Sequence, residues 1–184
     1  MKSELSLYSS YIESTFGKID HTHRLDCPED KPISLFYIND VPQKGYLTAI
    51  SYGLSESQLP GWNSIKPEII VSLKTHDESW GIAAAFLIRE LRQKKNFCYG
   101  EVYSLEERIS NESNMVAYFV MTPEFLPIER RVICLPDKRI ELMALYPIYK
   151  EEIDLYRKVG MEKFWMMEGS DFDNIYRKNL GLYS

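Results

Sequence analysis

The sequence predicts an α+β fold in which helices pack on a mixed, largely antiparallel β-sheet. Apolar residues recur at helical spacing in only a few segments, whereas short runs rich in β-branched and aromatic residues follow one another in groups. Strands and helices therefore do not alternate regularly, which disfavours a doubly wound parallel sheet. No linker rich in Pro, Gly or Ser divides residues 1–184, so we expect a single domain.

The N-terminal segment has the pattern of an amphipathic helix. Its apolar residues recur at helical spacing: Leu5, Tyr8, Ile12 and Phe16. Gly17 follows them as a stop signal, which predicts a helix over residues 3–16. The next segment, residues 18–32, is polar, and we expect it to be irregular.

Three strands are predicted in the first half of the chain. Residues 33–38 and 46–52 are nearly continuous apolar runs with turn-forming residues between them. This spacing predicts an antiparallel pair that is partly buried on both faces. Residues 53–67 have the composition of a loop, and residues 68–73 are predicted to form a third strand.

The strongest helical pattern covers residues 77–95. It places one apolar stripe along the helix: Trp80, Ala84, Leu87 and Leu91. The three alanines at positions 83–85 would let this helix lie close to a sheet.

Four further strands are predicted after this helix. Residues 97–103 give a short strand and residues 115–121 a stronger one. Residues 130–135 and 140–145 form a predicted hairpin, because turn-forming residues separate them: Pro136, Asp137 and Lys138.

The C-terminal part is predicted to be helical after Tyr146. Pro147 fixes a helical backbone angle at the start of one helix, which Gly160 ends. A short helix over residues 161–168 follows. Ser170 with Asp173 resembles a capping box that starts a last helix. The apolar face of that helix would be Phe172, Ile175, Tyr176 and Leu180.

Charge and composition exclude several classes of function. The 184 residues carry 22 Lys and Arg against 27 Asp and Glu, a net charge of −5 that opposes binding to nucleic acid. No apolar run reaches the roughly 18 residues that a membrane helix needs, so no membrane association is expected. The N-terminus lacks the apolar core of a secretory signal, and the 3 cysteines form no even framework. We therefore expect a cytoplasmic protein with free thiols.

One cluster has the residue types of a metal site. His21 and His23 would lie on one side of an extended segment, and Cys27 follows them. Zinc could use these ligands, so a metal-dependent hydrolase is one alternative function. No nucleophile motif or phosphate-binding loop accompanies the cluster. A solvated loop is the simpler interpretation, and we predict a non-enzymatic protein without a cofactor.

Several stretches together resemble the suppressor of fused (Sufu) domain family. They follow the order Y-G-L-S at residues 52–55, P-E-x-x-x-S-L at 67–73, S-W-G at 79–81 and Y-P-I-Y-x-E-E at 146–152. The resemblance runs over nearly the whole chain. It implies an α+β fold and a role in binding another protein rather than in catalysis.

The resemblance also implies a class of partner. The animal family protein restrains a transcription factor by binding a short peptide of it as an added β-strand, and it has a second, C-terminal domain. From its 184 residues, we expect this chain to correspond to the first domain. Stand-alone bacterial members are similar to immunity proteins of toxin systems. A negative charge suits that role because many toxins are basic. We therefore expect an immunity protein that occludes a toxin encoded nearby; a regulatory or self-associating scaffold is a further alternative.

The candidate contacts with a partner protein lie at or beside the ends of predicted strands, where loops gather. They are Tyr52, Trp62, Asn63 and Asp77. Tyr and Trp in loops are typical anchors of protein interfaces. The partner and the oligomeric state are left open by the sequence.

Overall fold

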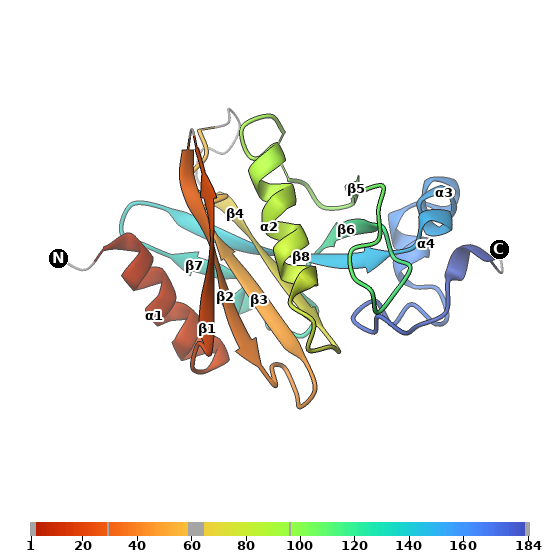
Figure 1. Cartoon of the computed structure of the whole chain (residues 1–184), viewed down its shortest axis with the longest axis horizontal. Coiled ribbons are helices and arrows are strands. Elements are labelled where there is room, and N and C mark those ends of the chain that lie inside the picture. The colour runs from red at the N-terminus through yellow and green to blue at the C-terminus, as the bar shows by residue number, and fades with distance from the viewer. Residues whose placement is uncertain (1–2, 29, 59–64, 96, 183–184) are drawn as a thin grey trace.

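A computed structural model of the chain describes residues 3–28, 30–58, 65–95 and 97–182. Within these ranges, one eight-stranded sheet carries four α-helices, as Figure 1 shows. The fold is α+β and its sheet is mixed and largely antiparallel, which confirms the fold class predicted from the sequence.

The elements follow the chain as one helix, four strands, a second helix, four more strands and two final helices. Their bounds are α1 Glu4–Phe16, β1 His21–Cys27, β2 Asp30–Asn39, β3 Leu47–Tyr52, β4 Ile65–Leu73, α2 Ser79–Leu91, β5 Val102–Ser104, β6 Ala117–Met121, β7 Val132–Cys134, β8 Arg139–Ile148, α3 Lys150–Val159 and α4 Met161–Trp165. Two short 3-10 turns, Ile128–Arg130 and Leu180–Leu182, complete the described structure.

The strands pair in the order β1-β2-β3-β4-β8-β6-β5, and β7 pairs with β8 outside this path. All pairings are antiparallel except that of β4 with β8. The long strand β8 pairs first with β4 and β7, and its end, from Ala144 to Ile148, pairs with β6. β8 therefore joins the two parts of the sheet, and the predicted hairpin before it is confirmed (Figure 1).

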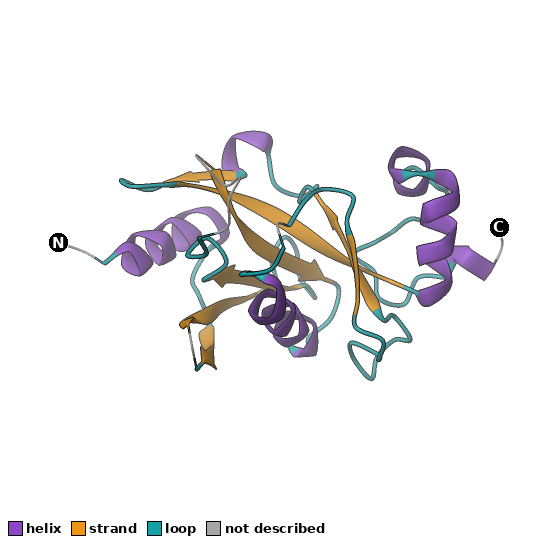
Figure 2. Cartoon of the chain, turned by 90° about the horizontal axis from the view of Figure 1, so that it is seen from above, coloured by secondary structure: helices purple, strands orange, loops and turns teal. Residues whose placement is uncertain are grey.

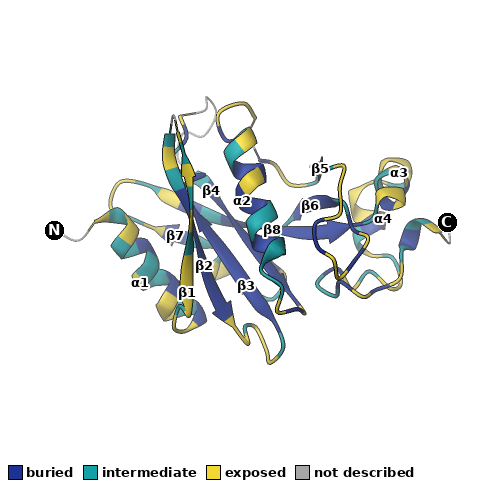
Figure 3. Ribbon diagram, in the orientation of Figure 1, coloured by how far each residue is buried: buried dark blue, intermediate teal, exposed yellow. Residues whose placement is uncertain are grey.

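Each face of the sheet has its own apolar core. The neighbouring residues Leu35 and Phe36 of β2 belong to opposite cores, because successive side chains of a strand point to opposite faces. α2 packs its buried residues on one core and α1 packs on the other. The central strands are buried along most of their length (Figure 3). Figure 2 shows α1 at one end of the molecule and α3 with α4 at the other.

α2 lies very close to the sheet, as its small residues predict. A Cβ atom on Gly81 would lie 2.7 Å from the Tyr37 hydroxyl oxygen and 2.8 Å from the Cβ of Ala49. Ala84 and Ala85 are also buried against this face. Gly81, one turn before Ala84 and Ala85, therefore leaves no room for a larger side chain between α2 and the sheet.

The prediction of an irregular segment over residues 18–32 is wrong. Residues 21–27 form β1, which pairs antiparallel with β2 at the edge of the sheet. All seven of its residues are exposed or half-buried. A polar composition is typical of edge strands and hides the strand pattern. The predicted strand over residues 97–103 likewise starts only at Val102.

Two predictions for the C-terminal part are also wrong. Pro147 lies in β8, opposite Tyr118 of β6, and α3 begins only at Lys150. No α-helix forms between Ser170 and Asn179, where the described chain makes a series of turns. Turn-forming residues outweigh the apolar pattern there. Phe172 and Leu180 are nevertheless buried in one apolar core and Ile175 in the other, because this segment folds back on the sheet.

The described helices are also informative about membranes. None of them combines the length and the apolarity that crossing a membrane requires.

Candidate functional site

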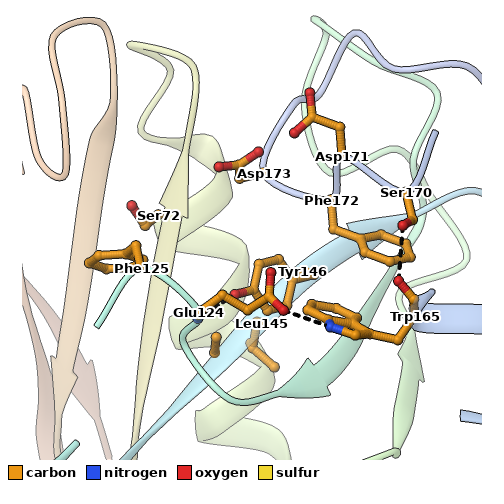
Figure 4. Close-up of a pocket in the computed structure, with 11 residues that line it drawn as sticks. Ser72, Glu124, Phe125, Leu145, Tyr146, Trp165, Ser170, Asp171, Phe172 and Asp173 are labelled. Atoms are coloured by element: carbon orange, nitrogen blue, oxygen red, sulfur yellow. Dashed lines mark hydrogen bonds between the residues drawn. The ribbon is translucent and has the colours of Figure 1, made fainter. Parts of the chain in front are cut away.

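A small pocket lies between the sheet and the segment that follows α4. Its volume is about 130 Å³. β4, the loop after β6, β8, α4 and the following segment all contribute to its walls. Figure 4 shows Phe125 on one side of the pocket and Trp165 with Phe172 on the other, with Glu124 and Tyr146 between them. The pocket thus combines aromatic rings with acidic side chains.

Three aromatic rings form a connected wall. Trp165 stacks on Phe172 with ring centroids 4.9 Å apart and an interplanar angle of 13°. Tyr146 meets Trp165 nearly edge-on at 5.0 Å. Tyr146 and Phe172 are buried, while Trp165 is half-buried and faces the pocket. Such contacts fix the rings in place, because aromatic pairs favour these geometries.

Local turns bring the segment after α4 to the pocket. Gly169 adopts a φ of 83°, a backbone conformation that favours glycine, and it reverses the chain after the helix. The Ser170 hydroxyl donates a hydrogen bond of 2.9 Å to the Trp165 carbonyl oxygen. The Lys74 amide then donates to the Asp173 carbonyl oxygen at 2.9 Å, which ties the segment to the end of β4.

Neutral side chains hold the carboxylates of the pocket. The Tyr46 hydroxyl donates to Asp173 Oδ2 at 2.9 Å, and the Trp165 indole N–H donates to Glu124 Oε1 at 2.8 Å. Asp171 accepts from the Asn174 side-chain amide at 3.1 Å. Burial, and after it the neighbouring Asp171 carboxyl group, raise the pKa of Asp173 to about 6.

Tyr52 and Asp77, the two predicted contact residues that the structure describes, do not line this pocket. Tyr52 is only 9% exposed, and its hydroxyl donates to Glu4 Oε1 at 2.9 Å. Asp77 is half-buried and accepts a hydrogen bond of 2.9 Å from the Ser79 amide at the start of α2. Tyr52 ends β3, whereas Asp77 follows β4, so the antiparallel pairing places them at opposite ends of these strands. Trp62 and Asn63 lie outside the described residues.

Asp77 and Tyr52 both have structural partners. Burial acts to raise the pKa of Asp77, but hydrogen bonds from Ser110 and Ser79 outweigh it and lower that pKa. The Tyr52 ring packs on Tyr8 of α1 with centroids 5.0 Å apart. Contact of the four residues with a partner protein stays a prediction.

The predicted metal ligands lie on β1. The His21 ring stacks on Tyr37 at 4.8 Å, and its Nε2 atom is 3.0 Å from Glu78 Oε1. Cys27 is half-buried, and its thiol contacts the Leu25 carbonyl oxygen at 3.7 Å. Across the described ranges, no group of three or more His, Cys, Asp and Glu residues has the arrangement to hold a metal ion.

The sequence did not identify the pocket residues as a site. Trp165 falls within the helix predicted over residues 161–168, and Asp173 falls within the predicted capping box. A signal was present, since residues 169–174 read Gly-Ser-Asp-Phe-Asp-Asn. Four of these residue types favour turns, and two acidic residues flank an aromatic one. Glu124 and Tyr146 carry no comparable local signal.

The fold and the pocket define an α+β domain with a negatively charged aromatic pocket at one end of its sheet. The family model described as "Suppressor of fused protein (SUFU)" matches residues 29–178. The chain belongs to the suppressor of fused family. A comparison with curated protein sequences found no match.

Solved structures of similar fold agree with this family. The Sufu–Fu complex crystal structure matches with a TM-score of 0.69 and 12% identity over 96% of this chain and 91% of that chain. A SUFU homologue from Neisseria gonorrhoeae FA 1090 matches with a TM-score of 0.67 and 12% identity over 95% and 93% of the two chains. Drosophila Suppressor of Fused matches with a TM-score of 0.61 and 12% identity, over 83% of this chain and 43% of its own length.

The stretches that resemble the family mainly hold the scaffold. Glu68 of the P-E-x-x-x-S-L stretch is fully buried and accepts hydrogen bonds from the Gly53 and Ser55 amides at 2.7 and 2.9 Å. It thereby fixes the Y-G-L-S turn after β3. In the Y-P-I-Y-x-E-E stretch, the buried Glu152 binds Arg177 and so anchors the chain after the pocket segment. Ser72 and Tyr146 also belong to these stretches, and both line the pocket.

Proposed function

We propose that this chain is a cytoplasmic protein-binding module that neutralises a toxin by covering its active surface. Membership of the suppressor of fused family supports a binding role, since one similar structure is that of Sufu in a complex with Fu. The net charge of −5 supports a basic partner, because complementary charge speeds encounter between proteins.

The pocket carries this proposal. It presents aromatic rings together with three carboxylates, Glu124, Asp171 and Asp173, at one end of the sheet. Aromatic side chains are enriched at protein interfaces, and a rim of one charge selects partners of the opposite charge. A surface of this kind can cover a basic active site without any chemical step.

Co-expression with the product of the adjacent reading frame tests the proposal. We expect the neighbouring protein to inhibit growth when produced alone, to be neutralised by this chain, and to co-purify with it. A neighbour that is neither toxic nor bound would overturn the immunity role.

A pair of charge reversals locates the interface. Glu124→Lys changes the pocket, whereas Glu107→Lys changes an exposed glutamate in the loop between β5 and β6. Only the first should weaken binding, by about tenfold or more if the pocket is at the centre of the interface. Equal effects of the two variants would show that overall charge alone matters.

The predicted contacts at Trp62 and Asn63 are tested in the same assay. Trp62→Ala should weaken toxin binding by about tenfold or more if this residue anchors the partner, and Asn63→Ala by less. Tyr52 and Asp77 are less informative to replace, because each has structural hydrogen bonds. Unchanged affinity in both alanine variants would leave the pocket as the remaining candidate surface.

A further inference from the structure

The carboxylates of the pocket have no cation within the chain. Among the described residues, no Lys, Arg or His forms an ion pair with Glu124, Asp171 or Asp173. Their hydrogen-bond donors are the neutral groups of Tyr46, Trp165 and Asn174. Glu124 and Asp171 are exposed, whereas Asp173 is partly buried, and ionising a partly buried carboxyl group is costly unless a cation offsets its charge.

We infer that this pocket receives an arginine side chain of the partner protein. The guanidinium group is planar, so it stacks on aromatic rings, and the rings of Phe125 and Trp165 line the pocket. Phe172 is already occupied, because Trp165 stacks on it and the Arg177 guanidinium lies 4.8 Å from its ring centroid. Its five N–H donors can reach carboxylates in two directions at once. Asp173 and Glu124 would accept these hydrogen bonds. The inference rests on the proposed role in binding a protein, and it gives the chemistry of the group that is bound.

Other occupants fit the pocket less well. Its volume of about 130 Å³ is small beside the pockets of roughly 300 Å³ or more that hold cofactors and metabolites. The carboxylates lack the arrangement that a metal ion needs in the described structure. An anion would be repelled, and a neutral side chain would leave the carboxylates without a counter-charge. A lysine would satisfy the charge but has no planar face for the rings.

Binding of a cation should be coupled to the protonation of Asp173. The groups around this carboxyl are Asp171 on the same segment, the Tyr46 hydroxyl before β3, Glu124 after β6 and Tyr146 on β8. Burial and then Asp171 raise the pKa of Asp173 to about 6. A guanidinium group favours the ionised form, so affinity should fall as the pH drops below 6.

The experiment uses a small probe and the intact chain. N-acetyl-L-arginine N-methylamide is titrated while the indole N–H signal of Trp165 is followed by ¹⁵N NMR. A Trp165→Phe variant assigns that signal, and the buried indole of Trp80 provides an internal reference. We expect a dissociation constant on the order of 1–10 mM, as befits one isolated side chain. The citrulline analogue has the same shape without the charge and should not bind, and the lysine analogue should bind more weakly.

Matched variants connect the signal to the pocket. Asp173→Asn should weaken probe binding by about tenfold or more, because it removes a charge-assisted hydrogen bond. Asp137→Asn, at an exposed turn between β7 and β8, should leave binding unchanged. In the unmodified chain, the affinity for the arginine probe should fall by up to about tenfold between pH 7 and pH 5, because only molecules with an ionised Asp173 bind the probe.

Three outcomes would overturn the inference. They are the absence of a shift at Trp165 up to about 50 mM probe, equal binding of the citrulline analogue, and binding of the lysine analogue as tight as that of the arginine probe. The probe assay needs no toxin, so its failure is distinguishable from failure of the immunity role. If the probe binds but the neighbouring protein is not toxic, the inferred recognition of arginine stands. Only the proposed toxin partner is then excluded.

Discussion

Two regions at the C-terminal end of the molecule hold their carboxylates in different ways. In one, the fully buried Glu152 binds the Arg177 guanidinium through Oε2 at 2.7 Å and accepts hydrogen bonds from the Tyr149 and Leu180 amides at 2.9 Å each. In the other, Asp173 accepts from the neutral Tyr46 hydroxyl and lies near a second carboxyl group.

The difference distinguishes a carboxylate that holds the fold together from carboxylates that remain available to bind a ligand. Glu152 has a cation and several donors, so its ion pair fastens α3 to the C-terminal segment and leaves little for a ligand. The ionised Asp173 carboxylate lowers the stability of the fold, because burial and the neighbouring Asp171 carboxyl group disfavour its ionisation. Residues that a fold keeps at a cost to its stability are common at functional sites. The comparison therefore favours the pocket as the binding site.

The largest expected effect comes from breaking the structural ion pair. Glu152→Gln leaves the buried Arg177 guanidinium without its counter-charge, which should lower the free energy of unfolding by about 3–5 kcal/mol. Urea denaturation measures this loss. The matched control is Glu151→Gln at the exposed neighbouring position, which should change stability by less than about 1 kcal/mol. Similar losses of stability in the two variants would show that the Glu152–Arg177 pair contributes no more to the fold than an exposed glutamate does.

Glu56 is a second carboxylate that is paired with cations, and the pH dependence of stability tests its contribution. Burial acts to raise the pKa of Glu56, but the ammonium groups of Lys138 and Lys31 outweigh it and bring that pKa to about 2. Because the folded pKa is lowered, the stability that Glu56 contributes is present above its unfolded pKa of about 4.5 and is lost as pH falls towards 2. After allowance for solvent screening the loss should be about 1–2 kcal/mol.

Thermal or urea unfolding between pH 2 and pH 6 measures the contribution of Glu56. In Glu56→Gln, the part of the pH dependence that belongs to this carboxylate should disappear. An identical slope in the variant and the unmodified chain would contradict the expected role of the two lysines.

The smallest expected effect, at Asp173, is a gain of stability and not a loss. The folded pKa of Asp173, about 6, lies above its unfolded value of 3.8, so ionisation of this group costs stability as pH rises from about 4 to 6. Asp173→Asn should therefore raise the free energy of unfolding at pH 7 by about 1 kcal/mol after allowance for screening, with no gain below about pH 4. A variant that is less stable than the unmodified chain at pH 7 would show that Asp173 supports the fold instead.

The sequence predicted elements best where one strong periodic pattern was present. The α2 stripe led by Trp80 and the hairpin around Asp137 are both found in the structure. It failed where local composition and tertiary contacts pull in different directions. β1 is too polar to be recognised from its sequence, and its place is decided by pairing with β2. The segment from Ser170 has a helical apolar pattern, but its turn-forming residues and its contacts with the sheet decide its path.

By itself, the sequence determined the fold class and the family likeness of this protein, because both rest on apolar periods and on short ordered stretches that are local along the chain. Only the tertiary structure decided where negative charge and aromatic rings meet. Glu124, Tyr146 and Asp173 come from three separate segments, and strand pairing with the turn after α4 brings them to one pocket. Whether a carboxylate finds a cation depends on these distant contacts, which is why Glu152 and Asp173 differ although both are acidic residues of the same C-terminal region.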